Sequence, residues 1–240
     1  MSYIDYTKIL TDQELKSIGA LMEQIKAAST RVSLKRIDGT PGEETVDLSM
    51  VLMSGLTYPE RFAIIKRFFD HYKGHDDPID MLWGLLTTGT FNDDLGRRSN
   101  LVNVFEPFCR HLYELVTGCP RPGIVLNDLF DLQAIDRSTF FMSKTSVLGR
   151  FFLKIKDARN IVGHGKTLPK DAGIMVVMGI LILIRQYAKQ LIVRFISDDE
   201  MTEADTARIA SADEILAETE ARMEALAMRQ ADDARSAIAA

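Results

Sequence analysis

The sequence predicts an all-α protein: a helical bundle with one small β-hairpin near residues 31–51 and an extended helix at the C-terminal end. Three observations lead to this prediction. Apolar residues recur at helical spacing along most of the chain. Proline and glycine residues stand where these periodic segments start and stop. The 240 residues, of which 46% are hydrophobic, suffice for a sizeable core without disulfide support.

The N-terminal elements are predicted from the spacing of apolar residues, which changes from helical to alternating. Apolar residues at helical spacing predict a first helix over residues 11–29, with Thr11 or Asp12 as its N-cap. Alternating apolar residues then flank the turn-like segment 38–42, which contains two glycines and a proline. This pattern predicts two short strands joined as a hairpin within residues 31–51.

The remaining segments predict further helices. Pro59 and Pro78 are suited to helix openings, and Trp83 belongs to a predicted core face. The predicted helices cover residues 60–72, 78–89, 100–117, 124–135, 138–162 and 171–196. The loop 164–170 is short, so the last of these helices is expected to be the antiparallel neighbour of the helix 138–162.

The most apolar run of the chain is residues 173–184, before Arg185. It is about 12 residues long, whereas a transmembrane helix needs roughly 20. We therefore expect a buried core helix, and the alternative is a membrane-associated segment within residues 173–197.

Charge divides the chain into two parts. Residues 198–240 hold 12 acidic and 4 basic residues, which leaves 22 of the 34 acidic and 25 of the 29 basic residues for 1–197. We predict a mildly basic helical domain over 1–197 and an acidic helical extension over 198–240. Apolar residues at a seven-residue spacing, Ile209, Leu216 and Met223, indicate either a packing helix that docks a partner protein through 200–230 or a solvated extension.

Two cysteines, Cys109 and Cys119, are too few for a disulfide framework or a cysteine-rich zinc site. The first residues lack the basic patch and apolar run of a secretory signal. A reducing cytoplasm is the expected location, and no glycine-rich phosphate loop or dinucleotide motif indicates a cofactor.

The segment 159–165, Arg-Asn-Ile-Val-Gly-His-Gly, carries the strongest functional pattern. Histidine transfers protons near neutral pH, and arginine binds phosphate through a two-pronged guanidinium, so Arg159 and His164 suit metal-free cleavage of an RNA phosphodiester. The amide of Asn160 can orient the phosphate or the ribose. Gly163 and Gly165 allow the helix to end here, so that His164 leaves the helical course and approaches Arg159.

Basic residues precede and follow this segment. We predict that Arg150, Lys154, Lys156 and Lys166 bind the phosphates of an RNA strand along the motif-bearing helix.

Arginine, asparagine and, after three further residues, histidine near a helix end in an all-α bundle resemble the HEPN superfamily (higher eukaryotes and prokaryotes nucleotide-binding domains). The resemblance covers about residues 100–196. It implies a metal-independent endoribonuclease with Arg159, Asn160 and His164 as the catalytic residues, and a homodimer in which two copies of the motif form one composite site. It also implies a role in bacterial defence or as a toxin. Residues 200–230 are where we expect a partner such as an antitoxin or an effector to dock.

Other readings remain open. Residues 70–77 combine two histidines with three carboxylates, which suits either a zinc or manganese site or a polar loop between helices. Arg97 and Arg98 are expected in a charged loop that grips RNA or is simply solvated, and residues 110–114 on a solvated helix face. The whole protein is alternatively a non-catalytic interaction module or a membrane-associated defence effector.

Overall fold

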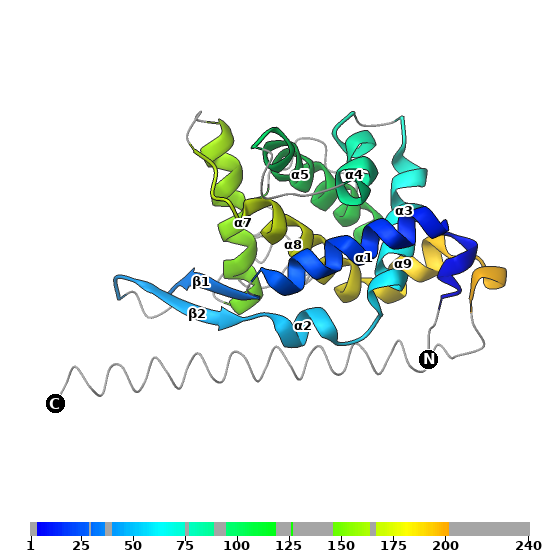
Figure 1. Cartoon of the computed structure of the whole chain (residues 1–240), viewed down its shortest axis with the longest axis horizontal. Helices are drawn as coiled ribbons and strands as arrows, with labels where there is room; N and C mark the ends of the chain where they lie inside the picture. Colours follow the sequence, from blue (N-terminus) through cyan, green and yellow to red (C-terminus); the bar gives the residue numbers. More distant parts are fainter. Residues whose placement is uncertain are drawn as a thin grey trace.

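The computed structural model describes residues 4–28, 30–36, 40–74, 77–88, 95–118, 126, 146–163 and 167–201. These residues form a mostly helical fold with a two-stranded antiparallel hairpin, as the sequence predicts (Figure 1). The main helices are α1 (Asp12–Ala27), α2 (Ser49–Met53), α3 (Tyr58–Tyr72), α4 (Asp77–Thr87), α5 (Leu95–Thr117), α7 (Val147–Gly163), α8 (Ala172–Gln186) and α9 (Ala188–Phe195). The strands are β1 (Arg31–Lys35) and β2 (Glu43–Asp47), and 3-10 turns occupy Tyr6–Lys8 and Asp198–Glu200.

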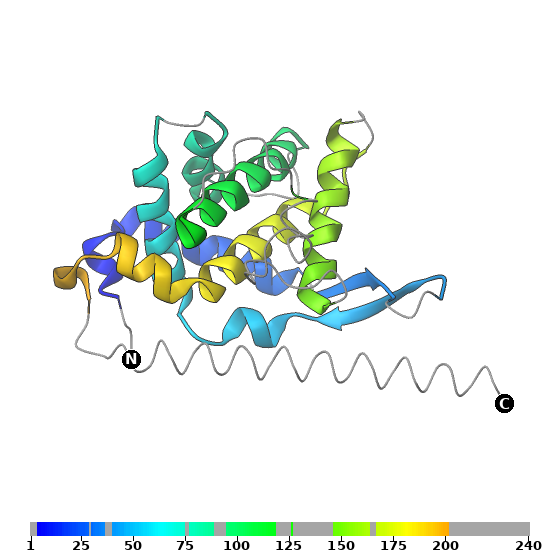
Figure 2. The ribbon, with the colours of Figure 1, turned by 180° about the vertical axis from the view of Figure 1, so that it is seen from behind.

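Helix α8 is the centre of the fold. Every residue from Ala172 to Arg185 is buried, and α8 packs against α2, α3, α5, α7 and α9. Figure 2 shows α8 running through the middle of the molecule, with α7 crossing one end of it at a steep angle. The predicted core helix is therefore confirmed, whereas α7 crosses α8 and does not lie alongside it as the expected antiparallel neighbour.

The predicted helix 171–196 is two helices. The chain bends by 79° between α8 and α9, at Tyr187. Within the described residues, no single helix has the length and apolarity to span a membrane, although α8 and α9 together pass that test as a bent pair. The apolarity of α8 has a structural cause, because neighbouring helices cover all of its sides.

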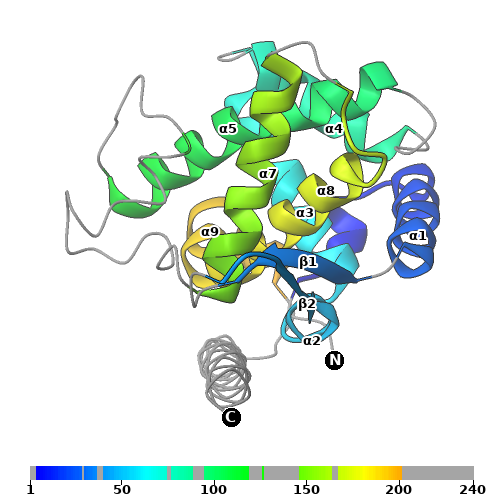
Figure 3. The same ribbon diagram turned by 90° about the vertical axis from the view of Figure 1, so that its left-hand side faces the viewer.

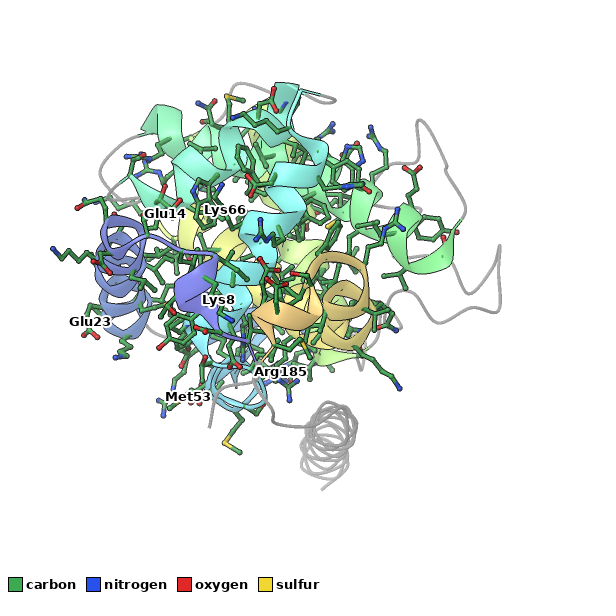
Figure 4. The ribbon with its side chains drawn as sticks, turned by 90° about the vertical axis from the view of Figure 1, so that its right-hand side faces the viewer. Lys8, Glu14, Glu23, Met53, Lys66 and Arg185 are labelled. Atoms are coloured by element: carbon green, nitrogen blue, oxygen red, sulfur yellow. The ribbon has the colours of Figure 1, made fainter. Side chains whose placement is uncertain are left out.

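Helices α1 and α3 begin with the same capping motif. Thr11 and Thr57 each form a capping box, in which the glutamate three residues later hydrogen-bonds back to the cap residue. Glu14 also accepts a hydrogen bond from the indole of Trp83 on α4, with 2.8 Å between Oε1 and Nε1. Figure 4 shows Glu14 close to Lys66 of α3, so one carboxylate at the start of α1 connects three helices.

The hairpin pairs Arg31 with Asp47 and Lys35 with Glu43, and it lies against α7 (Figure 3). Val32 and Leu34 on β1 are buried, whereas the residues that alternate with them, Arg31, Ser33 and Lys35, are more exposed. The period-two pattern in the sequence thus reflects one face of β1 packed on the helical core.

Several boundaries differ from the predictions. Helix α5 begins at Leu95, so Arg97 and Arg98 belong to a helix and not to a charged loop, and Arg98 is buried. The short helix α2 was not predicted. Of the predicted helix 124–135, the structure describes only Leu126. Residues 138–145 and the extension beyond Met201 also lie outside the described residues.

Candidate functional site

Helix α7 places the motif at its C-terminal end. The helix ends at Gly163, where the sequence predicts its end, and the side chains of Arg159 and Asn160 are exposed in its last two turns. His164 and Lys166 lie outside the described residues. Arg159 and Asn160 are therefore neighbouring exposed residues about one turn before the end of α7, and His164 follows that end in the sequence.

A buried carboxylate holds the guanidinium of Arg159. Glu106 on α5 is 8% exposed, and its Oε2 lies 3.3 Å from Nη2 of Arg159, whose side chain is 44% exposed. The other carboxylate oxygen accepts a hydrogen bond from Arg110, one turn further along α5, at 3.2 Å. Glu106 thus lies between two cations, and its Oε2 forms an ion pair with one nitrogen of the Arg159 guanidinium.

The side chains next to this cluster are less solvated than predicted. Arg110, His111 and Glu114 were expected on a solvated face, but all three are half-buried. The ring of His111 lies 4.2 Å from that of Tyr72 on α3, centroid to centroid. Burial and the nearby charge of Glu114 raise the pKa of Tyr72 to about 12.

Cys109 is buried next to Glu106 on the same helix. Complete burial raises the pKa of its thiol well above the usual range, and the negative charge of Glu106 adds to this effect. A thiol in this setting stays protonated, so it belongs to the packing of the core and not to the chemistry of the site.

Two of the predicted RNA-binding residues connect α7 to the hairpin. Nη1 of Arg150 donates to the carbonyl oxygen of Lys35 at 2.7 Å, and Nζ of Lys154 donates to that of Ser33 at 2.6 Å. Four residues along a helix rise about 6 Å, and two along a strand about 7 Å, so the two spacings match. Arg150 and Lys154 therefore cover the edge of β1 and do not form an open basic strip.

These residues and Arg159 point in different directions. Arg159 follows Arg150 by nine residues, a rotation of about 900° that leaves the two side chains about 180° apart around α7. Lys156, only three residues before Arg159, is the nearest to it of the basic residues predicted on α7. Whether any of them contacts RNA stays a prediction.

No group of three or more histidine, cysteine, aspartate or glutamate side chains suited to a metal ion occurs in the part of the chain that the structure describes. Within the predicted metal segment 70–77, the side chains of residues 75–77 lie outside that part. His71 instead packs edge-on against the ring of Tyr72, with centroids 4.8 Å apart.

Comparison of the chain with models of protein families, with characterised proteins and with solved structures finds no match.

Sequence reasoning missed Glu106. Its spacing from Arg110 predicts a helical ion pair, but nothing in the sequence connects it with Arg159, 53 positions later. Only the packing of α5 against α7 brings these residues together.

Proposed function

We propose that the protein is a metal-independent endoribonuclease of the HEPN kind, in which Arg159, Asn160 and His164 act on RNA. The observation that carries the proposal is the presentation of Arg159 and Asn160 on the exposed end of α7, with Arg159 in an ion pair with the buried carboxylate of Glu106. An exposed guanidinium is suited to bind a phosphate through two parallel hydrogen bonds.

In the proposed reaction, the 2′-oxygen of a ribose attacks the adjacent phosphorus and the bond from phosphorus to the 5′-oxygen breaks. One His164 removes the proton of the 2′-hydroxyl, and the partner subunit's His164 protonates the departing 5′-oxygen. The products are a 2′,3′-cyclic phosphate and a free 5′-hydroxyl, so no water or metal-bound hydroxide is consumed. Arg159 stabilises the charge that develops on the phosphate oxygens, and Asn160 orients the strand.

The two proton transfers require two histidines, whereas the motif supplies one per chain. The proposal therefore includes a homodimer in which two α7 ends meet. The exposure of Arg159 and Asn160 is compatible with such a meeting, since no described segment of the same chain covers them.

The test is cleavage of a fluorescent single-stranded RNA by the full chain in the presence of EDTA. Arg159→Ala and His164→Ala are each expected to lower kcat by about 10²–10⁴-fold, the range for loss of a proton-transfer or charge-stabilising group. Mass spectrometry of the products should find 2′,3′-cyclic phosphate ends. Specific activity should also fall on dilution below the dissociation constant of the dimer.

Arg194→Ala is the matched control, because Arg194 is likewise an exposed arginine near the C-terminal end of a helix. Its cleavage rate should equal that of the parent. Equal rates for the parent and the Arg159→Ala and His164→Ala proteins would falsify the proposal, and so would activity that EDTA abolishes and Mn²⁺ restores.

A further inference from the structure

Helix α9 presents an exposed face that combines two cations with an apolar side chain. The residues of this face, which we call the α9 face, are Lys189, Gln190, Val193 and Arg194. Val193 is 80% exposed, the largest value for a large hydrophobic residue in the described part of the chain. Lys189 and Val193 are four residues apart and are therefore neighbours on the helix surface, and Arg194 follows Val193 directly.

The two cations of the α9 face are not neutralised within the part of the chain that the structure describes. Neither Lys189 nor Arg194 forms an ion pair or a hydrogen bond with a described residue. A single unpaired cation on a protein surface is ordinary, because exposed ion pairs contribute little to stability. Two of them beside Val193 define a complementary surface, which is an acidic segment with an apolar side.

The chain supplies a segment of this kind shortly after α9. Residues 202–240 hold nine acidic and four basic residues, which gives this segment a net negative charge. Ile209, Leu216 and Met223 recur every seven residues, so they share one side of the predicted helix. The sequence alone leaves open whether this segment docks a partner or is solvated, and the α9 face adds a docking surface within the same chain.

The acidic residues of the segment have a spacing that matches the α9 face. Asp205 and Asp213 lie four residues before and four residues after Ile209. Residues four apart on a helix are neighbours, so both carboxylates flank the apolar side of the predicted helix. Lys189 has the same spacing from Val193. An apolar contact between the two helices therefore brings carboxylates close to cations.

The segment also begins near α9. Residues 196–201 form the connection, and connections of about two to eight residues are usual between neighbouring helices in bundles. The backbone N–H of Asp5 donates to the carbonyl oxygen of Glu200 at 2.8 Å, and Ile4 forms a β-bridge with Met201. Figure 1 shows the turn after α9, in orange, next to the N-terminal segment.

The segment is long enough to cover the α9 face. The eight residues of α9 rise by about 12 Å, whereas residues 202–216 rise by about 22 Å as a helix. Because the connection joins the two helices, their contact is intramolecular, and a short linker gives an effective concentration on the order of millimolar. A modest contact therefore suffices to keep the segment docked.

We propose that residues 202–223 form an acidic helix that folds back along α9. The apolar side of this helix lies against Val193, and its carboxylates lie next to Lys189 and Arg194. This inference does not rest on the proposed ribonuclease activity, because the motif belongs to α7, whereas α9 packs against α3 and α8.

Hydrogen–deuterium exchange of the full chain, measured by mass spectrometry, tests the proposal. The amides of residues 202–223 should exchange more slowly than those of 224–240. Val193→Glu removes the apolar contact and places a negative charge against the acidic helix, so the protection of 202–223 should fall about tenfold or more.

Met53→Glu is the matched control, because Met53 is 77% exposed and belongs to α2, outside the α9 face. Its effect on the protection of 202–223 should stay within about twofold. The buried helix α8 should exchange equally in both variants and in the parent, which shows that each variant is folded.

A charge reversal tests the electrostatic part of the contact. Lys189→Glu should lower the protection of 202–223 about threefold, the scale of an exposed ion pair. Asp205→Lys and Asp213→Lys together should restore the protection in the Lys189→Glu background, because opposite charges then face each other again.

Three results overturn the proposal, whether or not the protein cleaves RNA. Equal exchange of 202–223 and 224–240 in the purified chain removes the docked helix. Protection that falls when the protein is diluted about tenfold assigns the contact to a second copy of the chain. Equal effects of Val193→Glu and Met53→Glu place any docking site of the segment away from α9.

Discussion

Gly179 on α8 faces the helices that carry the candidate site, with no room for a side chain. A methyl group added there would lie 2.7 Å from Cδ1 of Ile155 on α7, and 3.3 Å and 3.4 Å from two ring carbons of Phe105 on α5. Carbon atoms pack best at about 3.5–4.0 Å. Gly179→Ala therefore requires Ile155 to move by roughly 1 Å in a core that has little free space.

The expected magnitude is a balance of two effects. Overpacking of this kind costs about 1–3 kcal/mol, whereas alanine gains about 1 kcal/mol over glycine in a helix interior. Gly179→Ala should lower the free energy of unfolding by about 0–2 kcal/mol. Gly19→Ala is the matched control, because Gly19 is an exposed glycine within α1 that has no atom within 4 Å of its added methyl group. It should stabilise the protein by about 0.5–1 kcal/mol.

Urea unfolding followed by circular dichroism measures both variants, which should differ by about 0.5–3 kcal/mol. Ile155→Val removes the clashing carbon and alone costs about 0.5–1.5 kcal/mol. In the Gly179→Ala background, Ile155→Val should lower the free energy of unfolding by less than it does in the parent protein. The two substitutions should therefore be coupled by more than about 0.5 kcal/mol. Equal stabilisation by Gly179→Ala and Gly19→Ala would refute the packing of α8 against α5 and α7.

Three further predictions concern single side chains. Glu106→Gln should lower RNA cleavage while Arg159 keeps its charge, because the neutral amide holds the guanidinium less firmly; an unchanged rate would show that Glu106 does not position Arg159. In a Cys119→Ser background, Cys109 should react with a thiol reagent only as the protein unfolds, because complete burial keeps the reagent from its thiol; rapid labelling of the folded protein would contradict this. Burial alone would raise the pKa of Glu14, but hydrogen bonds from Thr11 and Trp83 lower it below its unfolded value, so its stabilisation is complete above about pH 5 and is lost as the pH falls through the folded pKa. Urea titrations should find that Glu14→Gln costs about 1 kcal/mol at pH 7 and less at pH 3, and a cost independent of pH would contradict the assignment.

Local signals explain how much of the fold was predictable. The capping residue Thr11, the opening proline Pro59 and the end of α7 at Gly163 each act within a few residues, and each lies where the sequence places it. The bend at Tyr187 was not predictable in this way. Helical spacing continues through it, and neither proline nor glycine marks it, so the break follows from packing around α8.

The candidate site likewise combines a local motif, which the sequence indicates, with long-range contacts, which it does not. The motif itself is local, so the sequence indicates Arg159 and Asn160 directly. The contacts around the motif are long-range. Glu106, which pairs with Arg159, comes from α5, and the carbonyl groups that accept hydrogen bonds from Arg150 and Lys154 come from β1. A run of basic residues on one helix does not reveal which side chains face solvent, because that depends on the neighbouring element.

This division leads to a last prediction about the basic residues of α7. Lys154 is five positions before Arg159, about 140° away around the helix, and its Nζ is bonded to the hairpin. Lys154→Gln should therefore leave KM for RNA within about twofold and destabilise the protein by about 1 kcal/mol. Lys156 lies about 60° from Arg159, so Lys156→Gln should raise KM severalfold and reduce the salt dependence of binding by about one phosphate contact. Cleavage kinetics at two salt concentrations measure both effects. A larger rise of KM in Lys154→Gln than in Lys156→Gln would place the RNA on the hairpin side of α7, where Arg159 cannot reach its phosphate.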